Sequence, residues 1–202
     1  TRPEEAPDEA EVVTIEFERG VPVALDGERL GLVELLERAA VLGARHGVGI
    51  VDQLEDRIVG LKVRDIYEIP AAAILLPAHQ ELERLVGTIH QNQLKPMLDQ
   101  RWAYLVYAGL WWEPLREDLD AYMQAANAQV TGTIGIKLYK GSARVVTRSS
   151  PNAIYDPQLA TFAESGGLFS QAASPGFIEL WSLQSRMAWR VRHGGGDPRP
   201  RE

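Results

Sequence analysis

The sequence predicts an α+β fold, in which helices pack on an antiparallel sheet and a protruding helix follows at the C-terminus. Two observations favour this class. Segments that alternate apolar and polar residues occur in neighbouring pairs, as β-hairpins do, near the beginning of the chain and again after residue 129. Apolar residues at helical spacing occupy much of the interval between those pairs. This order of elements does not favour a doubly wound parallel sheet.

The first expected hairpin follows an acidic, proline-rich opening, residues 1–10, which we interpret as a linker. In EVVTIEFE, Val13, Ile15 and Phe17 alternate with polar residues, which is typical of a half-buried strand. ERG is then a turn and VPVAL a second strand, and the DG pair at 26–27 is a further turn signal.

An amphipathic helix and two short strands come next. LVELLERAAVLGARHG has apolar residues at helical spacing and is expected to end at Gly43 or Gly47. VGIVDQL and RIVGLKV predict two short strands. We expect residues 50–54 to pair with residues 58–62, with EDR at the turn.

Three helices and a second hairpin follow. The helices are PAAAILLPAHQELERLVGTIHQNQ from Pro70, PMLDQRWAYLVYAGLWW, and EPLREDLDAYMQAANAQ, with Pro114 at its start. VTGTIGIKLYKG and RVVTR predict the hairpin. SSPNAIYDPQLATF is irregular and could contain a short helix, and residues 165–174 predict a loop of small residues. SPGFIELWSLQSRMAWRVR predicts a last helix, capped by Ser174, before the tail HGGGDPRPRE.

Composition limits what the chain can do. It has 202 residues, 45% hydrophobic and 24% charged, which suits a substantial globular domain. Its net charge of −7 argues against a nucleic-acid-binding surface as its main purpose. It has no cysteine, which excludes disulfides and thiolate catalysis and fits a cytoplasmic location. No segment approaches the ~18 apolar residues that a membrane span requires.

A high density of charges marks residues 54–70, LEDRIVGLKVRDIYEIP. Within it, a carboxylate at Glu55 and a phenol at Tyr67 would suit an amino-acid ligand, because a carboxylate accepts hydrogen bonds from an ammonium and a phenol donates to a carboxylate or ureido oxygen. The alternative is that Glu55 belongs to a solvated turn and that Tyr67 lies along the surface with its hydroxyl in water. The spacing alone leaves both interpretations open.

The sequence gives little support for a metal site, a phosphate-binding turn or an aromatic stacking surface. The histidines have no metal-binding spacing, so no metal site is expected: His46, His79, His90 and His193. GARHGVG follows a helix and not a strand, which is the wrong context for a phosphate-binding turn. The aromatic residues between 102 and 112 are expected in a core or an interface.

The last helix is apolar on more than one face. Its main stripe contains Phe177, Leu180, Trp181, Gln184, Met187, Ala188 and Val191. Leu183 and Trp189 lie outside that stripe. A terminal helix of this kind packs either on a partner chain or on its own domain, and the sequence leaves both open.

A resemblance to a known family rests on a collinear set of segments. These are RHGVG, LEDRIVGLKVRDIYEIPAA, AHQELE, LVYAGLWWEPLREDLDAY, VTGTIGIKLYKGSARVV, SPNAIYDPQLATF and SPGFIELWSLQSRMAWR. In this order, and without large gaps, they resemble the part of argininosuccinate synthase that follows its nucleotide-binding half. The resemblance covers nearly all of the chain.

The resemblance implies a cytoplasmic, homotetrameric ligase of arginine biosynthesis that joins citrulline to aspartate with ATP and Mg²⁺. It proceeds through a citrullyl-adenylate and releases AMP and pyrophosphate. Glu55 and Tyr67 match the family residues that contact citrulline, and no catalytic residue is expected in this chain. Because the family's nucleotide-binding domain with its SGGLDTS-type loop is not in this sequence, the chain alone is expected to be inactive. Residues 1–10 would be a linker from that domain, 11–165 the synthetase domain, and 166–202 the oligomerisation helix and tail.

Three residues near the expected citrulline site depart from the family's usual pattern. Val63 stands for serine, Asp65 for glycine and Ile50 for arginine. These differences leave room for a paralogous ligase that acts on a different ureido or amide substrate. An alternative from another class is a stand-alone amino-acid-binding or assembly module without chemistry.

Overall fold

A computed structural model describes residues 1–157 and 170–195. The chain divides into two compact units, one of residues 1–155 and one that begins at Asp156. The first unit contains two antiparallel sheets and four α-helices, and the second contains one α-helix in its described part. The predicted α+β class is therefore confirmed.

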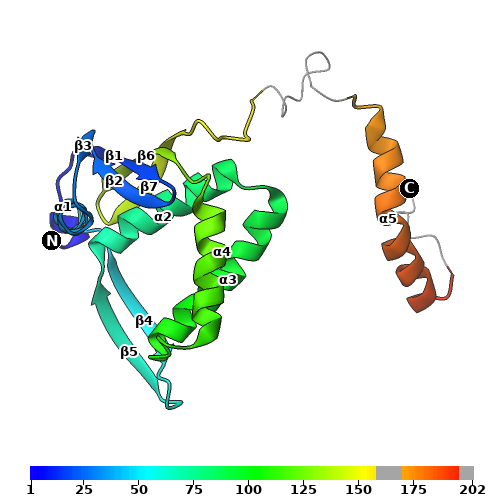
Figure 1. Ribbon diagram of the computed structural model, residues 1–202, viewed down its shortest axis with the longest axis horizontal. Helices are drawn as coiled ribbons and strands as arrows, with labels where there is room; N and C mark the ends of the chain where they lie inside the picture. Colours follow the sequence, from blue (N-terminus) through cyan, green and yellow to red (C-terminus); the bar gives the residue numbers. More distant parts are fainter. Residues whose placement is uncertain (158–169, 196–202) are drawn as a thin grey trace. The chain divides into compact units, whose positions relative to one another are not determined.

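A five-stranded antiparallel sheet forms the centre of the first unit (Figure 1). Its strands lie in the order β3-β2-β1-β6-β7. Their bounds are β1 (Glu11–Glu18), β2 (Val21–Leu25), β3 (Glu28–Arg29), β6 (Gly132–Tyr139) and β7 (Ser142–Ser149). Strand β1 pairs with both β2 and β6, so the two predicted hairpins are confirmed and joined edge to edge in one sheet.

Helices α1 (Leu32–Arg45) and α2 (Pro70–Val86) pack against this sheet and against each other. The alternating residues of β1 that the sequence placed in a core are buried, and α2 covers them together with residues of β6. The largest wholly buried side chains of this core are Ile15, Leu35, Ile74, Leu82, Ile134, Ile136 and Leu138. Burial of apolar surface is the main force that holds the sheet and these helices together.

The predicted boundary between the next two helices is wrong. The structure breaks the chain at Gly87 and Thr88, and α3 (Ile89–Tyr107) then continues through Pro96. Thr88 begins α3 with a capping box, in which its backbone N–H donates to the Gln91 side chain at 2.9 Å and its hydroxyl accepts from the Gln91 N–H. Helix α4 (Pro114–Asn127) packs on α3, with Pro114 in its first turn as predicted.

A separate two-stranded hairpin, β4 (Ile50–Asp56) and β5 (Lys62–Glu68), extends away from the five-stranded sheet (Figure 1). The predicted pairing of residues 50–54 with 58–62 is wrong, because residues 57–61 form the turn. The Arg57 N–H donates to the Leu61 carbonyl at 2.8 Å, and Gly60 adopts a φ of +82°. The apolar run IVGL therefore lies in the turn and not in a strand.

The residues before β1 contain one turn of 3₁₀ helix, η1 (Pro3–Glu5), and Ala6 after it is buried. Pro3 lies against Gly47 and Gly141, where an added Cβ would approach it to 2.8 Å and 3.1 Å. Glycine at both positions allows this close approach.

The described part of the second unit is helix α5 (Ala173–Arg192). Its N-cap residue is Ala172, so the predicted cap at Ser174 is wrong: Ser174 lies inside the first turn, and no side chain caps this end. The predicted loop at 165–174, the irregular segment 149–162 and the C-terminal tail fall partly outside the described residues. The predicted domain boundary at residues 165 and 166 lies wholly outside them.

Candidate functional site

The β4–β5 hairpin has two different faces. Glu55 lies opposite Val63, and Val51 lies opposite Tyr67. Because side chains alternate along a strand, Glu55, Asp65 and Tyr67 share one face. The side chains of this face, which we call the inner face, are mostly half-buried. The register therefore brings the two predicted site residues onto the same face.

Ion pairs between strands occupy the opposite, exposed face. Arg64 donates to both carboxylate oxygens of Asp52, at 2.8 and 2.5 Å, and Lys62 donates to Asp56 at 2.7 Å. Exposed pairs of this kind contribute little to stability because water screens them. They account for part of the charge density of residues 54–70.

Arg57 lies between two carboxylates of the inner face. Its guanidinium donates to Asp65 Oδ2 at 2.6 Å, and its other terminal nitrogen is 3.5 Å from Glu55 Oε1. Arg57 is thus hydrogen-bonded to Asp65 and only loosely paired with Glu55. Two carboxylates and one guanidinium give this cluster a formal charge of −1.

Glu55 carries the least satisfied polar atom of the inner face. Its side chain is only 14% exposed, and its buried Oε1 has no hydrogen-bond partner. Buried polar atoms in proteins nearly always have a partner, because an unpaired one carries a desolvation penalty. A bound N–H donor at this position would remove that penalty.

Tyr67 is the phenol of the same face. Its hydroxyl is 3.4 Å from Asp65 Oδ2, which is a long contact for an O–H donor. Burial, followed by the neighbouring carboxylates of Glu55 and Asp65, raises the pKa of Tyr67 above its ordinary value, while Arg57 opposes the shift. The phenol is therefore neutral at physiological pH and can both donate and accept a hydrogen bond.

The three departures from the family's usual pattern lie on this hairpin. Val63 is on the inner face directly opposite Glu55, and Asp65 is on the inner face in the Arg57 ion pair. Ile50 begins β4, pairs with Glu68 and is half exposed. Two of the three differences therefore change the surface that Glu55 and Tyr67 share.

A cluster that the sequence analysis missed joins α2 to α3. Lys95 Nζ lies 2.6 Å from Glu83 Oε1 and 2.8 Å from Asp99 Oδ1, and His79 Nδ1 lies 3.4 Å from the same Glu83 oxygen. The i,i+4 spacing of His79 with Glu83 and of Lys95 with Asp99 was visible in the sequence. The contact between these two pairs, which lie on α2 and α3, was not visible in the sequence because the expected helix boundary was wrong.

This cluster predicts how stability depends on pH. Burial lowers the pKa of His79 below the ordinary 6.5, with Lys95 adding to the shift and Glu83 and Asp99 opposing it. Below pH 6.5 the unfolded chain therefore binds a proton that the folded chain binds only at lower pH. Stability should fall as the pH falls through this window, by up to about 1.4 kcal/mol per pH unit.

Urea unfolding between pH 7.5 and pH 5 measures this dependence. We expect His79→Gln to flatten the slope, whereas His90→Gln, at an exposed position of α3, should leave it unchanged. An identical slope in His79→Gln and the unmodified chain would contradict the prediction.

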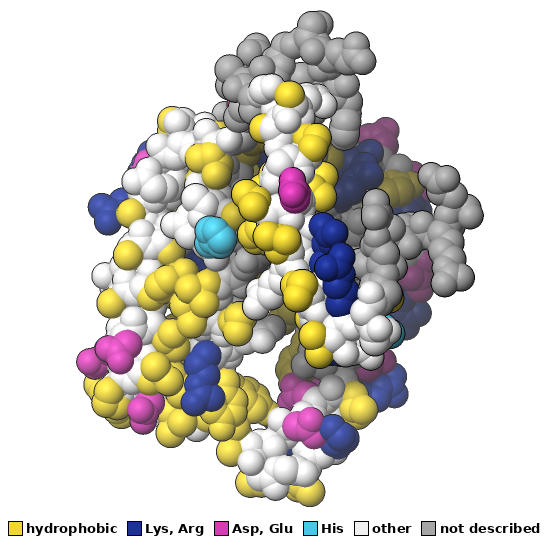
Figure 2. Space-filling view, turned by 90° about the vertical axis from the view of Figure 1, so that its right-hand side faces the viewer, with side chains coloured by type: hydrophobic (Ala, Val, Ile, Leu, Met, Phe, Trp, Pro, Cys, Tyr) yellow, Lys and Arg dark blue, Asp and Glu magenta, His cyan; other side chains and the backbone are white. Residues whose placement is uncertain are grey.

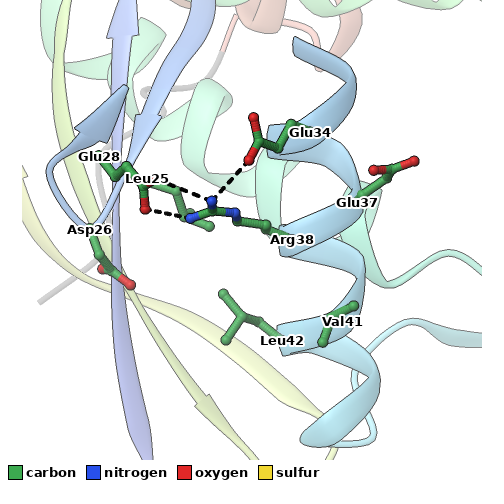
Figure 3. A pocket seen from close by; sticks show the side chains of 8 residues that line it. All are labelled: Leu25, Asp26, Glu28, Glu34, Glu37, Arg38, Val41 and Leu42. Atoms are coloured by element: carbon green, nitrogen blue, oxygen red, sulfur yellow. Dashed lines mark hydrogen bonds and ion pairs between the residues drawn. The ribbon is translucent and has the colours of Figure 1, made fainter. Parts of the chain in front are cut away.

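Two cavities lie in the first unit. One of about 610 Å³ lies between α1 and the β2–β3 turn, where Arg38 of α1 reaches across to Glu28 and also pairs with Glu34 on its own helix (Figure 3). Arg38 is thereby hydrogen-bonded to both carboxylates. The other, of about 530 Å³, lies among α2, α3 and α4 beside the Lys95 cluster, where Trp102 donates to Asp120 at 2.7 Å. In both cavities the charged groups named here are already paired with one another.

Within residues 1–157 and 170–195, no group of three or more histidine, cysteine, aspartate or glutamate side chains is arranged to hold a metal ion. Over the same residues, none of the helices has the length and apolar character needed to cross a bilayer.

Fold and hairpin together define an α+β domain whose β4–β5 hairpin places Glu55, Asp65 and Tyr67 on one face. The family described as arginosuccinate synthase C-terminal domain matches residues 1–188, and the chain belongs to this family. The resemblance noted from the sequence is thereby confirmed.

Relatives from bacteria and archaea agree with this assignment. The chain is 50% identical to the argininosuccinate synthase of Rubrobacter xylanophilus over 184 residues, which cover 91% of this chain and 45% of that protein. It is 47% identical to the argininosuccinate synthase of Pyrococcus furiosus over 191 residues, or 95% of this chain and 46% of that protein. The chain thus spans about half the length of the curated relatives it matches.

Proposed function

We propose that this chain is the C-terminal part of an argininosuccinate synthase, an ATP-dependent ligase of citrulline and aspartate in arginine biosynthesis. In the proposed reaction, the ureido oxygen of citrulline attacks the α-phosphorus of ATP and pyrophosphate leaves. The aspartate amine then attacks the activated carbon of the citrullyl-adenylate, loses a proton, and AMP leaves. ATP and Mg²⁺ would be bound mainly by an N-terminal nucleotide-binding domain, so the chain alone would be inactive and would hold no catalytic residue.

The observation that carries the proposal is the inner face of the β4–β5 hairpin. Glu55 supplies a buried oxygen without a hydrogen-bond partner, and Tyr67 supplies a neutral phenol. Citrulline is a zwitterion with a ureido group, so it has the N–H donors and the acceptors that these two side chains can bind. Their role would be to hold the ureido oxygen in position for attack and not to transfer a proton.

The domain arrangement is part of the same proposal. Residues 11–165 would form the synthetase domain, residues 1–10 the linker before it, and residues 166–202 the oligomerisation helix and tail. We place the enzyme in the cytoplasm.

Helix α5 would supply contacts in a homotetramer. Hydrophobic side chains are prominent on this helix (Figure 2), and the large exposed ones are Phe177, Ile178, Leu180, Trp181, Leu183, Met187 and Val191. A helix with so much exposed apolar surface is typical of a protein–protein interface. A second copy of the same chain would bury it with closed symmetry.

Glu55→Ala in the complete cellular protein tests the citrulline-binding role. The variant loses a charge-assisted hydrogen bond to the substrate, so we expect the KM for citrulline to rise by about 10- to 100-fold while the KM for ATP changes little. Asp52→Ala is the matched control, because it removes a carboxylate from the exposed face of the same hairpin. An unchanged citrulline KM in Glu55→Ala would count against the proposed site.

A paralogous ligase with another ureido or amide substrate is the second candidate. The observation that favours it is Asp65, which adds a carboxylate to the inner face where glycine is usual in the family. Steady-state assays with alternative ureido and amide acceptors would separate the two: a kcat/KM higher than that for citrulline would favour the paralogue.

A further inference from the structure

Asp65 lies beside the proposed citrulline site but is not one of the two residues proposed to contact citrulline. It lies on the strand opposite Glu55, two positions along on the same face, and Arg57 reaches both carboxylates from the turn. The two contacts of Arg57 are unequal, at 2.6 Å to Asp65 and 3.5 Å to Glu55.

We propose that Asp65 is a positioning residue, which holds the Arg57 guanidinium away from Glu55 and so keeps Glu55 Oε1 free for an N–H donor of the amino-acid substrate. This inference rests on the proposed function, because it gives Asp65 a role in binding the same ligand.

The geometry carries this step. A guanidinium and a carboxylate that have no competitor form a short, paired hydrogen-bond contact. Glu55 Oε1 instead lies at the limit of contact with Arg57 and has no hydrogen bond, although it is buried. Asp65 is the competing acceptor, since its Oδ2 receives the short bond from Arg57 Nη2.

Charge leads to the same conclusion. Without Asp65, the charges of Arg57 and Glu55 would neutralise one another, and these side chains would carry no net charge. With Asp65, the three side chains carry a formal charge of −1, and the acceptor without a partner is the oxygen of Glu55. An ammonium or an amide N–H placed there would supply the missing hydrogen bond and, if charged, would balance the excess.

The predicted consequence concerns binding and not the chemical step. In Asp65→Asn, the Arg57 guanidinium should move onto Glu55 and compete with the substrate for Oε1. We expect the citrulline KM of the complete cellular protein to rise about tenfold, with kcat and the ATP KM within about twofold of the unmodified enzyme. Asp65→Glu, which keeps the acceptor, should restore most of the affinity.

A double-mutant cycle separates this role from a structural one. If Asp65 acts by holding Arg57, then Asp65→Asn should change the citrulline KM by less than about twofold in an Arg57→Gln background. Asp52→Asn is the matched control, because it weakens an equivalent ion pair on the exposed face and should leave citrulline binding unchanged. A tenfold effect that persists without Arg57, or no effect of Asp65→Asn with Arg57 present, would overturn the inference.

The donor group can be identified in the same experiment. 5-Ureidopentanoate keeps the ureido and carboxylate groups of citrulline but lacks the ammonium, and its inhibition constant can be measured against citrulline. If the ammonium contacts Glu55, Asp65→Asn should weaken citrulline and leave this analogue unchanged; if the ureido N–H does, both should weaken equally. The Glu55→Gln variant distinguishes the proposed function from this inference. If Glu55→Gln leaves the citrulline KM unchanged, the proposed function is wrong. If Glu55→Gln raises the citrulline KM and Asp65→Asn does not, only the role of Asp65 is wrong.

Discussion

Gly49→Ala is expected to destabilise the chain by about 2–5 kcal/mol, as the sum of backbone strain and overpacking. Gly49 adopts a φ of +94°, which an L-residue adopts only with strain. An added Cβ would also lie 2.5 Å from Pro70 Cα and 2.6 Å from Pro70 N. Because both are backbone atoms, no side-chain rotation relieves the clash, and the start of β4 must move away from the start of α2.

Guanidinium chloride unfolding of the 202-residue chain measures this cost, and Gly60→Ala provides the control. Gly60 also has a positive φ, +82°, but nothing lies within 4 Å of its added Cβ. Its substitution should therefore show the backbone strain alone, about 1–2 kcal/mol. Equal costs at the two glycines would mean that the approach to Pro70 is unimportant.

The same substitution bears on the proposed site, because Gly49 immediately precedes β4. The Ile69 N–H donates to the Gly49 carbonyl at 2.8 Å, so this residue joins the two ends of the β4–β5 hairpin. Moving Gly49 should shift Glu55 relative to the rest of the domain. We therefore expect the variant to weaken citrulline binding in addition to lowering stability.

Local patterns in the sequence predicted most of the fold. The two hairpins of the five-stranded sheet were evident because one face of β1 is buried, and this gives strict alternation at Val13, Ile15 and Phe17. The register of β4 and β5 was not evident from the sequence, because neither face of that hairpin is fully buried and the alternation of apolar and polar residues is weak. For this reason, apolar residues of the turn, such as Val59 at 78% exposure, were predicted to belong to a strand.

The position of the break between α2 and α3 was also predicted wrongly from the sequence. Pro96 suggested a helix start, whereas the structure accommodates it inside α3. The true signal was the capping box at Thr88 and Gln91, which the continuous helical spacing of apolar residues obscured. Tertiary packing on the sheet, which sequence spacing does not contain, decides where such a helix ends.

The candidate site was predicted only in part. The resemblance singled out Glu55 and Tyr67, and the register places them on one face, but their contact with citrulline remains a prediction. Arg57 and Asp65 were visible as charges without an assigned role. Their arrangement depends on which oxygen a guanidinium reaches across a turn, and such competition among three side chains cannot be inferred from spacing.

Leu82→Ala is expected to lower the free energy of unfolding by about 3–5 kcal/mol, near the upper end for leucine truncation. Leu82 is fully buried where α2 crosses the sheet, and its Cδ1 lies only 3.0 Å from the position of a Cβ added to Gly132 of β6. Because glycine has no side chain that could move into the space, the cavity should remain largely open, and its size sets the cost. Leu76→Ala on the same helix, at 59% exposure, is the matched control and should cost less than about 1 kcal/mol. Chemical unfolding of both variants measures these two losses of unfolding free energy. A similar loss for the two leucines would mean that α2 is not held to the sheet through Leu82. A large loss for Leu82 alone would show that the contact between α2 and β6 stabilises this unit.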